Sequence, residues 1–278
     1  MDVYESRFDY SKQKAFNFAF FSDLHLESKT HNRTQLDKDI KEAIEAGCRI
    51  YIGGDICEAI MPGDLKRYTR GRDSIDADAQ LNEITRICFE WMRPYANFID
   101  WIGIGNHEEA ALKHSHYDIT LGVITLLNME RDKNLQPIHH GGYKSFIRWR
   151  FEHGENSRTR TVTALHFHGT GGGAPVTKGM IDINRLRCDY EADIFWIGHK
   201  HTEITDKPQR ICLDTSGRII AREQRAFFTA GYQDCYEQDD YSDGYKISFA
   251  DRMLSATSIG FAMLEVRLTE PISYRLTA

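Results

Sequence analysis

The chain has 278 residues, 41% of them hydrophobic, so it can bury a sizeable core in one large domain or two small ones. Its 35 basic and 41 acidic residues give a net charge of −6, which argues against wholesale coating of nucleic acid but not against a local basic channel. The six cysteines include no Cys-x-x-Cys pair, so neither a zinc knuckle nor a disulfide framework is indicated. The first residues are too polar for a signal peptide and no apolar run reaches membrane length, so we expect a cytoplasmic protein.

The first two thirds of the chain predict an alternation of strands and helices. Residues 16–21 form a short apolar run that is typical of a buried strand, and Asp23 and His25 follow its end. Residues 36–44 then place apolar side chains at helical spacing, and Gly47 suits the end of that helix. Open α/β sheets typically place their functional polar residues at the carboxyl ends of buried strands.

A second strand and an irregular segment come next. Residues 49–52 predict a strand, and Asp55 and Glu58 follow it. Residues 61–77 show no hydrophobic period and contain several cations, so we expect an insertion that extends from a site loop. It is interpreted either as a solvated loop, which is the commoner case, or as a basic lid over a phosphate-bearing substrate.

The next strand carries the densest group of polar side chains. Apolar residues at helical spacing between 81 and 91 lead into residues 98–103, which predict a buried strand. That strand stops at Gly-x-Gly, which lets the backbone turn sharply, and Asn106 and His107 follow. An amide and an imidazole there suggest a metal or phosphate site, although a helix-capping turn is a common alternative.

Two further strands end in histidines. Residues 161–165 and 193–197 are short apolar runs that predict buried strands, while residues 144–151 alternate like a half-exposed strand. The histidines that follow the first two runs are His166, His168, His199 and His201.

From residue 208 onward the helical period disappears and antiparallel strands are predicted, at 209–213, 219–228 and 259–268. No repeat or low-complexity linker divides the chain, so we predict a single α/β domain over residues 1–278. Its fold class is two packed mixed β-sheets flanked by helices, with the strands of 208–278 completing the second sheet.

The five strand ends together predict a metal site. Each motif alone is commonly a turn or a helix cap. Because ligands of open α/β sheets bind at the carboxyl ends of the strands, five such ends would bring carboxylates, an amide and imidazoles together. Oxygen and imidazole ligands without thiolate suit manganese, iron or zinc.

The order of these motifs resembles a known superfamily. Asp-x-His, Gly-Asp-x-x-Glu, Gly-Asn-His-Glu, His-Gly and Gly-His-x-His follow one another between Asp23 and His201, as in the calcineurin-like metallophosphoesterases of phage and bacterial type. The resemblance implies a four-layer sandwich and two divalent ions, with manganese expected and iron, zinc or nickel as alternatives. It implies that one ion is held by Asp23, His25, Asp55 and His201. It implies that the other is held by Asp55, Asn106, His199 and one of His166 and His168.

The choice between the two central histidines stays open at this stage. In an alternating strand His166 and His168 project to the same face, so parity does not separate them. We prefer His168, because it is the last residue before Gly169 and is the less hindered of the two. The other histidines match no motif and are predicted to lie on the surface: His31, His114, His116, His139, His140 and His153.

The resemblance also implies a proton donor. His107 occupies the position of the general acid that protonates the leaving oxygen, while two cations activate a shared water and neutralise the phosphoryl oxygens. Glu58 falls where the superfamily places a carboxylate that orients this histidine and favours its charged form. The other interpretation of Glu58 is a plain surface acid.

Two departures from the superfamily pattern restrict the class of substrate. Protein phosphatases of the superfamily carry arginines at the positions of Ala59 and Ile104. Without those bidentate clamps a phosphoprotein is disfavoured. The predicted partner is therefore a phosphate ester, either a phosphodiester or a phosphomonoester, that is nucleotide-like.

Two alternatives remain, and neither includes a membrane partner. A DNA-repair-type nuclease acting on nucleic acid would need a basic strip beside the site. The candidates for that strip are Lys66, Arg67, Arg70, Arg72, Arg148 and Arg150. A catalytically silent interaction module would keep the fold without the chemistry, but a scaffold has no need of a proton donor such as His107.

Overall fold

The computed structural model describes most of the chain. The described residues are 1–28, 30–59, 80–153, 159–171, 177, 179–214, 216–234 and 258–277. The predicted insertion 61–77, with its four cations, lies outside them.

Sheet I contains the strands predicted first along the chain. Its order is β14-β13-β2-β3-β4-β5. The bounds are β2 Ala15–Phe21, β3 Arg49–Ile52, β4 Ile99–Ile102, β5 His139–His140, β13 Ala262–Arg267 and β14 Ser273–Thr277. Strands β2, β3, β4 and β5 are parallel, and β13 is antiparallel to β2. The carboxyl ends of β2, β3 and β4 therefore lie at one edge.

Sheet II packs against sheet I and has the order β1-β6-β7-β8-β12-β9. The bounds are β1 Asp2–Asp9, β6 Lys144–Glu152, β7 Arg160–Phe167, β8 Ile194–Ile197, β9 Ile204–Asp206 and β12 Arg225–Phe228. Strands β7, β8 and β12 are parallel. The strand β1 was not predicted; it pairs in parallel with β6 along its whole length.

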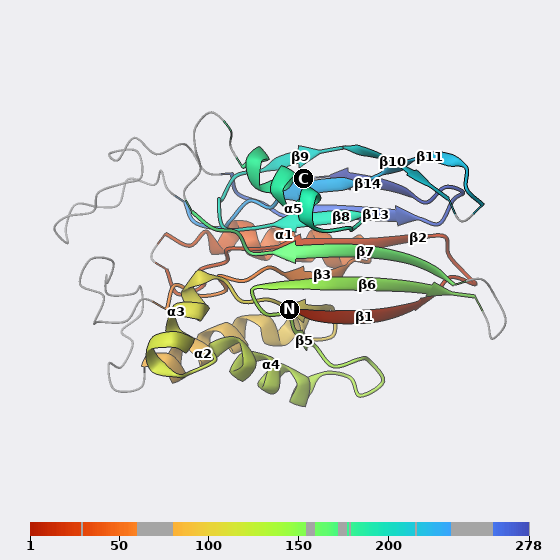
Figure 1. The fold of residues 1–278 in the computed structure, drawn as a ribbon. Coiled ribbons are helices and arrows are strands. Elements are labelled where there is room, and N and C mark those ends of the chain that lie inside the picture. Colours follow the sequence, from red (N-terminus) through yellow and green to blue (C-terminus); the bar gives the residue numbers. More distant parts are fainter. Residues whose placement is uncertain are drawn as a thin grey trace.

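Helices cover the outer faces of both sheets (Figure 1). Their bounds are α1 Arg33–Glu45, α2 Gln80–Met92, α3 Asn106–Ser115, α4 Ile119–Glu130 and α5 Met180–Asp189, with a short 3₁₀ turn at Arg93–Tyr95. Apolar side chains of α1, α2 and α4 pack on sheet I, and those of α5 pack on sheet II. The fold class is thus the predicted one, two mixed sheets flanked by helices. In the described part of the chain, every helix is too short or too polar to cross a membrane.

An aromatic core joins the two sheets. The ring of Phe18 on β2 stacks on Trp149 of β6, with 4.2 Å between the ring centroids. The indole N–H of Trp149 donates a hydrogen bond to the hydroxyl of Tyr51 on β3 (2.9 Å), which satisfies both buried polar groups. Each strand therefore keeps a fixed position relative to the facing sheet, and so does the loop at its end.

The strands after residue 208 differ from the prediction. They were expected to be antiparallel and to complete the second sheet, but they divide between three sheets. Strands β10 (Gln209–Leu213) and β11 (Ile219–Glu223) form a separate antiparallel pair. Strand β12 joins sheet II parallel to β8, while β13 joins sheet I antiparallel to β2. The reason is that a strand pairs with whichever edge is open beside it, and local alternation carries no information about that edge.

Candidate metal centre

Loops from both sheets meet at the carboxyl ends of their strands. The Asp23 amide, after β2, donates a hydrogen bond to the carbonyl of Gly54, after β3 (3.0 Å). Oδ2 of Asp23 accepts a hydrogen bond from the amide of His199, after β8 (2.8 Å). Nδ1 of His168, after β7, donates to the carbonyl of Gly53 (2.9 Å). The two sheets thus contribute to one site, and in Figure 1 helix α3, which begins at that site, lies at the opposite end of the strands from the β10–β11 hairpin.

Carboxylate and imidazole groups in these loops form three overlapping clusters that could hold metal ions. Within each cluster the ligand atoms lie within 4.8 Å of one another. The clusters are Asp23 with His25 and His201, Asp55 with His168 and His199, and His25 with Asp55 and His107. The first two contain members of the two predicted ligand sets. Oδ1 of Asn106 adjoins the second cluster, 3.3 Å from Nε2 of His168.

The backbone of the site is strained where the candidate ligands lie. Seven described residues other than glycine have φ in the left-handed region, and five of the seven are candidate ligands. These are Asp23 (54°), His25 (47°), Asp55 (47°), His199 (71°) and His201 (46°). Each such residue costs about 1–2 kcal/mol, so the surrounding structure must hold it in place. Outliers of this kind concentrate at functional sites.

The donor groups fit a pair of divalent cations. Asp23, His25 and Asp55 are each at most 2% exposed. Among the described residues, none donates a hydrogen bond to Oδ1 of Asp23, which lies 3.4 Å from Nε2 of His201, and none makes a hydrogen bond with Nε2 of His25. Buried polar atoms without partners are costly, and a cation between them would satisfy both. Carboxylate oxygens and imidazole nitrogens suit manganese, iron or zinc, as the sequence predicted.

Asp55 lies between the clusters. Its Oδ2 is 3.1 Å from Nε2 of His168 and 4.0 Å from Nε2 of His107, while its Oδ1 accepts a hydrogen bond from the His107 amide (3.0 Å). Burial by itself would raise the pKa of the Asp55 carboxyl, but the neighbouring histidines, His168 first, outweigh it and hold that pKa well below its usual range. Asp55 is thus ionised, and its carboxylate lies within 4.8 Å of ligand nitrogens of His25 in one cluster and of His168 and His199 in another.

The structure separates the two central histidines. Strand β7 ends at Phe167, so His168 lies beyond the strand and its Nε2 faces Asp55. His166 is still within the strand, where its ring lies against Trp101 and Trp196 in the core between the sheets. Burial holds the pKa of His166 well below its usual value, which keeps that imidazole neutral. Of the two, His168 is therefore the one whose Nε2 adjoins the candidate ligands.

We expect His168→Ala to lose one of the two metal ions, and His166→Ala to keep both. The hydrogen bond from Nδ1 of His168 to Gly53 leaves Nε2 to face the site. His166 instead donates from Nε2 to the same carbonyl (3.1 Å). Elemental analysis of the purified variants measures the number of ions. Loss of an ion from His166→Ala alone would reverse the assignment.

His107 is the second residue of α3, and its ring adjoins the candidate metal centre. Its Nδ1 lies 2.5 Å from the main-chain carbonyl of Glu58, so Nδ1 carries hydrogen. Its Nε2 therefore faces the site, and its side chain is 15% exposed. The same position also puts His107 in the third cluster, so metal ligation is a geometrical alternative to the role of acid.

The contact of Glu58 differs from the prediction. We predicted that its carboxylate orients His107, but its main-chain carbonyl makes that contact. The carboxylate Oε2 instead lies 2.8 Å from Nδ1 of His25. Burial would raise the pKa of Glu58, but His25 lowers it to about 2. The backbone is left-handed at Asp55 and Ala59, on either side of Glu58, and sequence spacing predicts neither this backbone nor the direction of the side chain.

Glu108 has a role that the sequence analysis missed. This carboxylate is 2% exposed. It accepts hydrogen bonds from the amides of Asp55 (3.0 Å), Cys57 (3.1 Å) and Gly105 (2.7 Å). It thereby ties the loop after β3 to the start of α3. The available signal was a glutamate three residues after the helix N-cap, the spacing of a capping box.

We expect Glu108→Gln to lower the free energy of unfolding by about 1–3 kcal/mol, because an amide NH₂ would face one of the backbone donors. Urea unfolding measures this change. Glu109→Gln is the matched control, since Glu109 lies next along α3 and pairs only with Lys113 (2.9 Å) among the described residues. That control should stay within about 0.5 kcal/mol of the wild type. Equal effects of the two substitutions would remove the proposed role of Glu108.

The remaining histidines and the two described arginines of the predicted basic strip lie outside the metal centre. His114, His116 and His153 are exposed and His139 and His140 are half-buried, but His31 is buried at 4% exposure, contrary to the surface position predicted for it. Its segment forms a bridge with Gln233, a contact between distant parts of the chain. Arg148 and Arg150 pair with Glu5 on the outer face of sheet II and are not at the strand ends.

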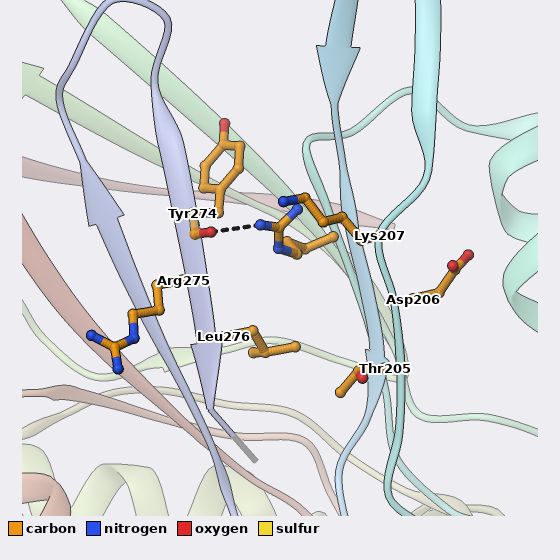
Figure 2. Close-up of a pocket in the computed structure, with 7 residues that line it drawn as sticks. Thr205, Asp206, Lys207, Tyr274, Arg275 and Leu276 are labelled. Atoms are coloured by element: carbon orange, nitrogen blue, oxygen red, sulfur yellow. Dashed lines mark hydrogen bonds between the residues drawn. The ribbon is translucent and has the colours of Figure 1, made fainter.

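A cavity of about 380 Å³ lies outside the site, between the edge strands β9 and β14 (Figure 2). Lys207, Arg225 and Arg275 line it. Both Lys207 (3.1 Å) and Arg225 (2.7 Å) pair with Glu223, and Arg225 also donates to the Tyr274 carbonyl (2.6 Å). Glu223 thus pairs with two of the three cations of this cavity, and no candidate metal ligand lines it.

Comparison with known proteins gives similarity in overall structure alone. No family profile and no curated protein matches the chain. Among solved structures, a metallophosphoesterase from Sphaerobacter thermophilus is 13% identical, with 95% of this chain and 88% of that chain covered and a TM-score of 0.31. The calcineurin-like phosphoesterase YfkN from Bacillus subtilis is 12% identical, with 95% and 90% covered and a TM-score of 0.34. GAP50, the anchor in the inner membrane complex of Plasmodium, is 11% identical, with 96% and 85% covered and a TM-score of 0.45. These values are too low to support a functional inference, which depends on the side chains of the site.

Proposed function

We propose that this protein is a metal-dependent phosphoesterase of the calcineurin-like type, with manganese as the preferred ion. The observation that carries the proposal is the convergence of three overlapping acid–histidine clusters, two of which contain Asp55, at the ends of strands from both sheets. Asp23, His25, Asp55 and His201 would hold one ion. Asp55, Asn106, His168 and His199 would hold the other. When bound, such a pair supplies an activated water and neutralises the charge of the phosphoryl oxygens.

The protein's own residues supply the rest of the chemistry. His107 protonates the leaving oxygen from Nε2, because its Nδ1 is engaged by the Glu58 carbonyl. Glu108 holds the loops of Asp55 and His107 at a constant separation. The buried carboxylates exclude bulk water from the inner side of the site, while His107 and His201 (15% and 16% exposed) face its opening.

The proposed substrate is a nucleotide-like phosphodiester or phosphomonoester. Ala59 is buried and Ile104 is half-buried, so neither position offers a cation for a phosphoprotein. Histidine is the only basic residue type among the candidate ligands and His107. Two divalent ions would supply the remaining positive charge that a phosphate ester needs.

We expect the metal-free protein to be inactive and manganese to restore hydrolysis of bis-p-nitrophenyl phosphate. Elemental analysis should find up to two ions per chain. A panel of p-nitrophenyl phosphate, cyclic nucleotides and single-stranded DNA then identifies the ester class. A preference for DNA that weakens steeply with salt would favour the nuclease alternative. Two bound ions without hydrolysis of any ester would favour the silent module.

A further inference from the structure

The side chain of Glu58 has a contact that the proposed reaction does not use. Its carboxylate Oε2 lies 2.8 Å from Nδ1 of His25, a side chain that is 2% exposed. We propose that Glu58 is a positioning residue for His25, holding the imidazole so that Nε2 faces the candidate metal centre, with Gln233 holding the carboxylate. The inference rests on the metal-binding part of the proposed function, and it assigns to Glu58 a role in ion affinity instead of proton transfer.

The two nitrogens of His25 have different surroundings. Both nitrogens are buried and neither makes a well-aligned hydrogen bond with a described residue, but Nδ1 lies 2.8 Å from Oε2 of Glu58 as an ion pair. The ring stacks on His201 at 5.3 Å between centroids and meets the edge of His107 at 5.0 Å. A carboxylate on one imidazole nitrogen fixes the proton there, makes the other nitrogen more basic and limits rotation of the ring. One nitrogen of His25 lies within 4.8 Å of the ligand atoms of Asp23 and His201, and the contact of Nδ1 with Glu58 leaves Nε2 for an ion there.

Glu58 serves two histidines through different atoms. Its main-chain carbonyl contacts Nδ1 of His107 at 2.5 Å, and its side chain contacts His25. Removing the side chain would therefore take away the contact with His25 and leave the contact with His107. This separation makes the two roles distinguishable by substitution.

Gln233 supplies the second contact of the carboxylate. Its Nε2 donates a hydrogen bond to Oε2 of Glu58 (2.9 Å), and its own side chain is largely buried. Gln233 follows β12, and its backbone pairs with that of His31. The carboxylate is therefore held from sheet II while it faces a histidine that follows a strand of sheet I. Residues far apart in sequence thus set the orientation of His25.

The test is calorimetric titration of manganese into the metal-free full chain. We expect Glu58→Ala to weaken one of the two sites by about 10–100-fold and to leave the other unchanged. Glu58→Gln keeps an acceptor oxygen and should recover part of that loss, and Gln233→Leu should show a smaller loss at the same site. His25→Ala sets the scale for loss of the ligand itself, and Glu109→Gln is the control expected to bind like the wild type.

Turnover and thermal unfolding complete the test. If Glu58 positions His25, saturating manganese restores the turnover of Glu58→Ala equally for esters with good and poor leaving groups. The melting temperature of the metal-free variant should stay that of the metal-free wild type, which a merely structural residue would not allow.

Three results would overturn the inference. They are unchanged affinity at both sites in Glu58→Ala, loss of turnover on poor leaving groups alone at saturating manganese, and a wild type that binds no ion. The second result would return the carboxylate to His107. Because calorimetry needs no turnover, the role of Glu58 is decided even if the wild type hydrolyses none of the esters, so this inference and the proposed function fail separately.

Discussion

Asp55→Asn is expected to lose both metal ions and, with them, hydrolysis. Asp55 faces His168 and His107 through Oδ2 and accepts the His107 amide through Oδ1. Asparagine keeps the size and the acceptor for that amide but removes the charge shared by the two clusters. Substituting a residue that only orients a ligand typically costs 10–100-fold in metal affinity, so loss of the shared ligand should exceed about 100-fold.

Calorimetry and elemental analysis measure this loss, with Asp118→Asn as the matched control. Asp118 caps α4 by accepting from the Leu121 amide (2.8 Å), and asparagine caps helices equally well. The control should bind two ions and remain active. Retention of both ions at wild-type affinity in Asp55→Asn would remove Asp55 from the centre and end the proposal of a shared carboxylate.

His107→Gln is expected to keep both metal ions but to lose turnover. Because Nε2 of His107 faces the site while Nδ1 is held by the Glu58 carbonyl, the imidazole is placed to protonate a leaving oxygen. Loss of a general acid typically costs 10²–10⁴-fold, so alkyl esters should slow by about that factor. Esters of p-nitrophenol, whose leaving group needs little protonation, should slow far less.

The measurement is kcat for a series of leaving groups at saturating manganese, together with the ion content of the variant. His114→Gln provides the control, since His114 lies exposed on the same helix α3. Equal slowing of all esters would show that His107 is not the acid. Loss of an ion together with equal slowing would identify it as a ligand, as the third cluster allows geometrically.

Much of the fold was predictable from local pattern. The runs that became β2, β3, β4, β7 and β8 are short and apolar, and the polar residues that follow them are adjacent in sequence. Hydrophobic periodicity and strand-end position are local properties, so the α/β class and the candidate residues of the site could be inferred without coordinates. The pairing of β1 with β6 and the division of the last strands between sheets required contacts between distant segments.

The details of the site required the tertiary structure for a similar reason. Strand parity left His166 and His168 equivalent, and the end of β7 at Phe167 separated them. The family resemblance implied that the carboxylate of Glu58 orients His107, but that carboxylate contacts His25. The left-handed backbone at Asp55 and other candidate ligands has no local sequence signal, because only the surrounding packing can hold residues other than glycine there.

By itself the amino-acid sequence determined which side chains stand at the ends of which strands, because that depends on neighbours along the chain. Only the tertiary structure decided which atoms of those side chains face one another. The facing loops, including those of Asp23 and His199, come from different sheets, and their separation is set by the aromatic core between the sheets.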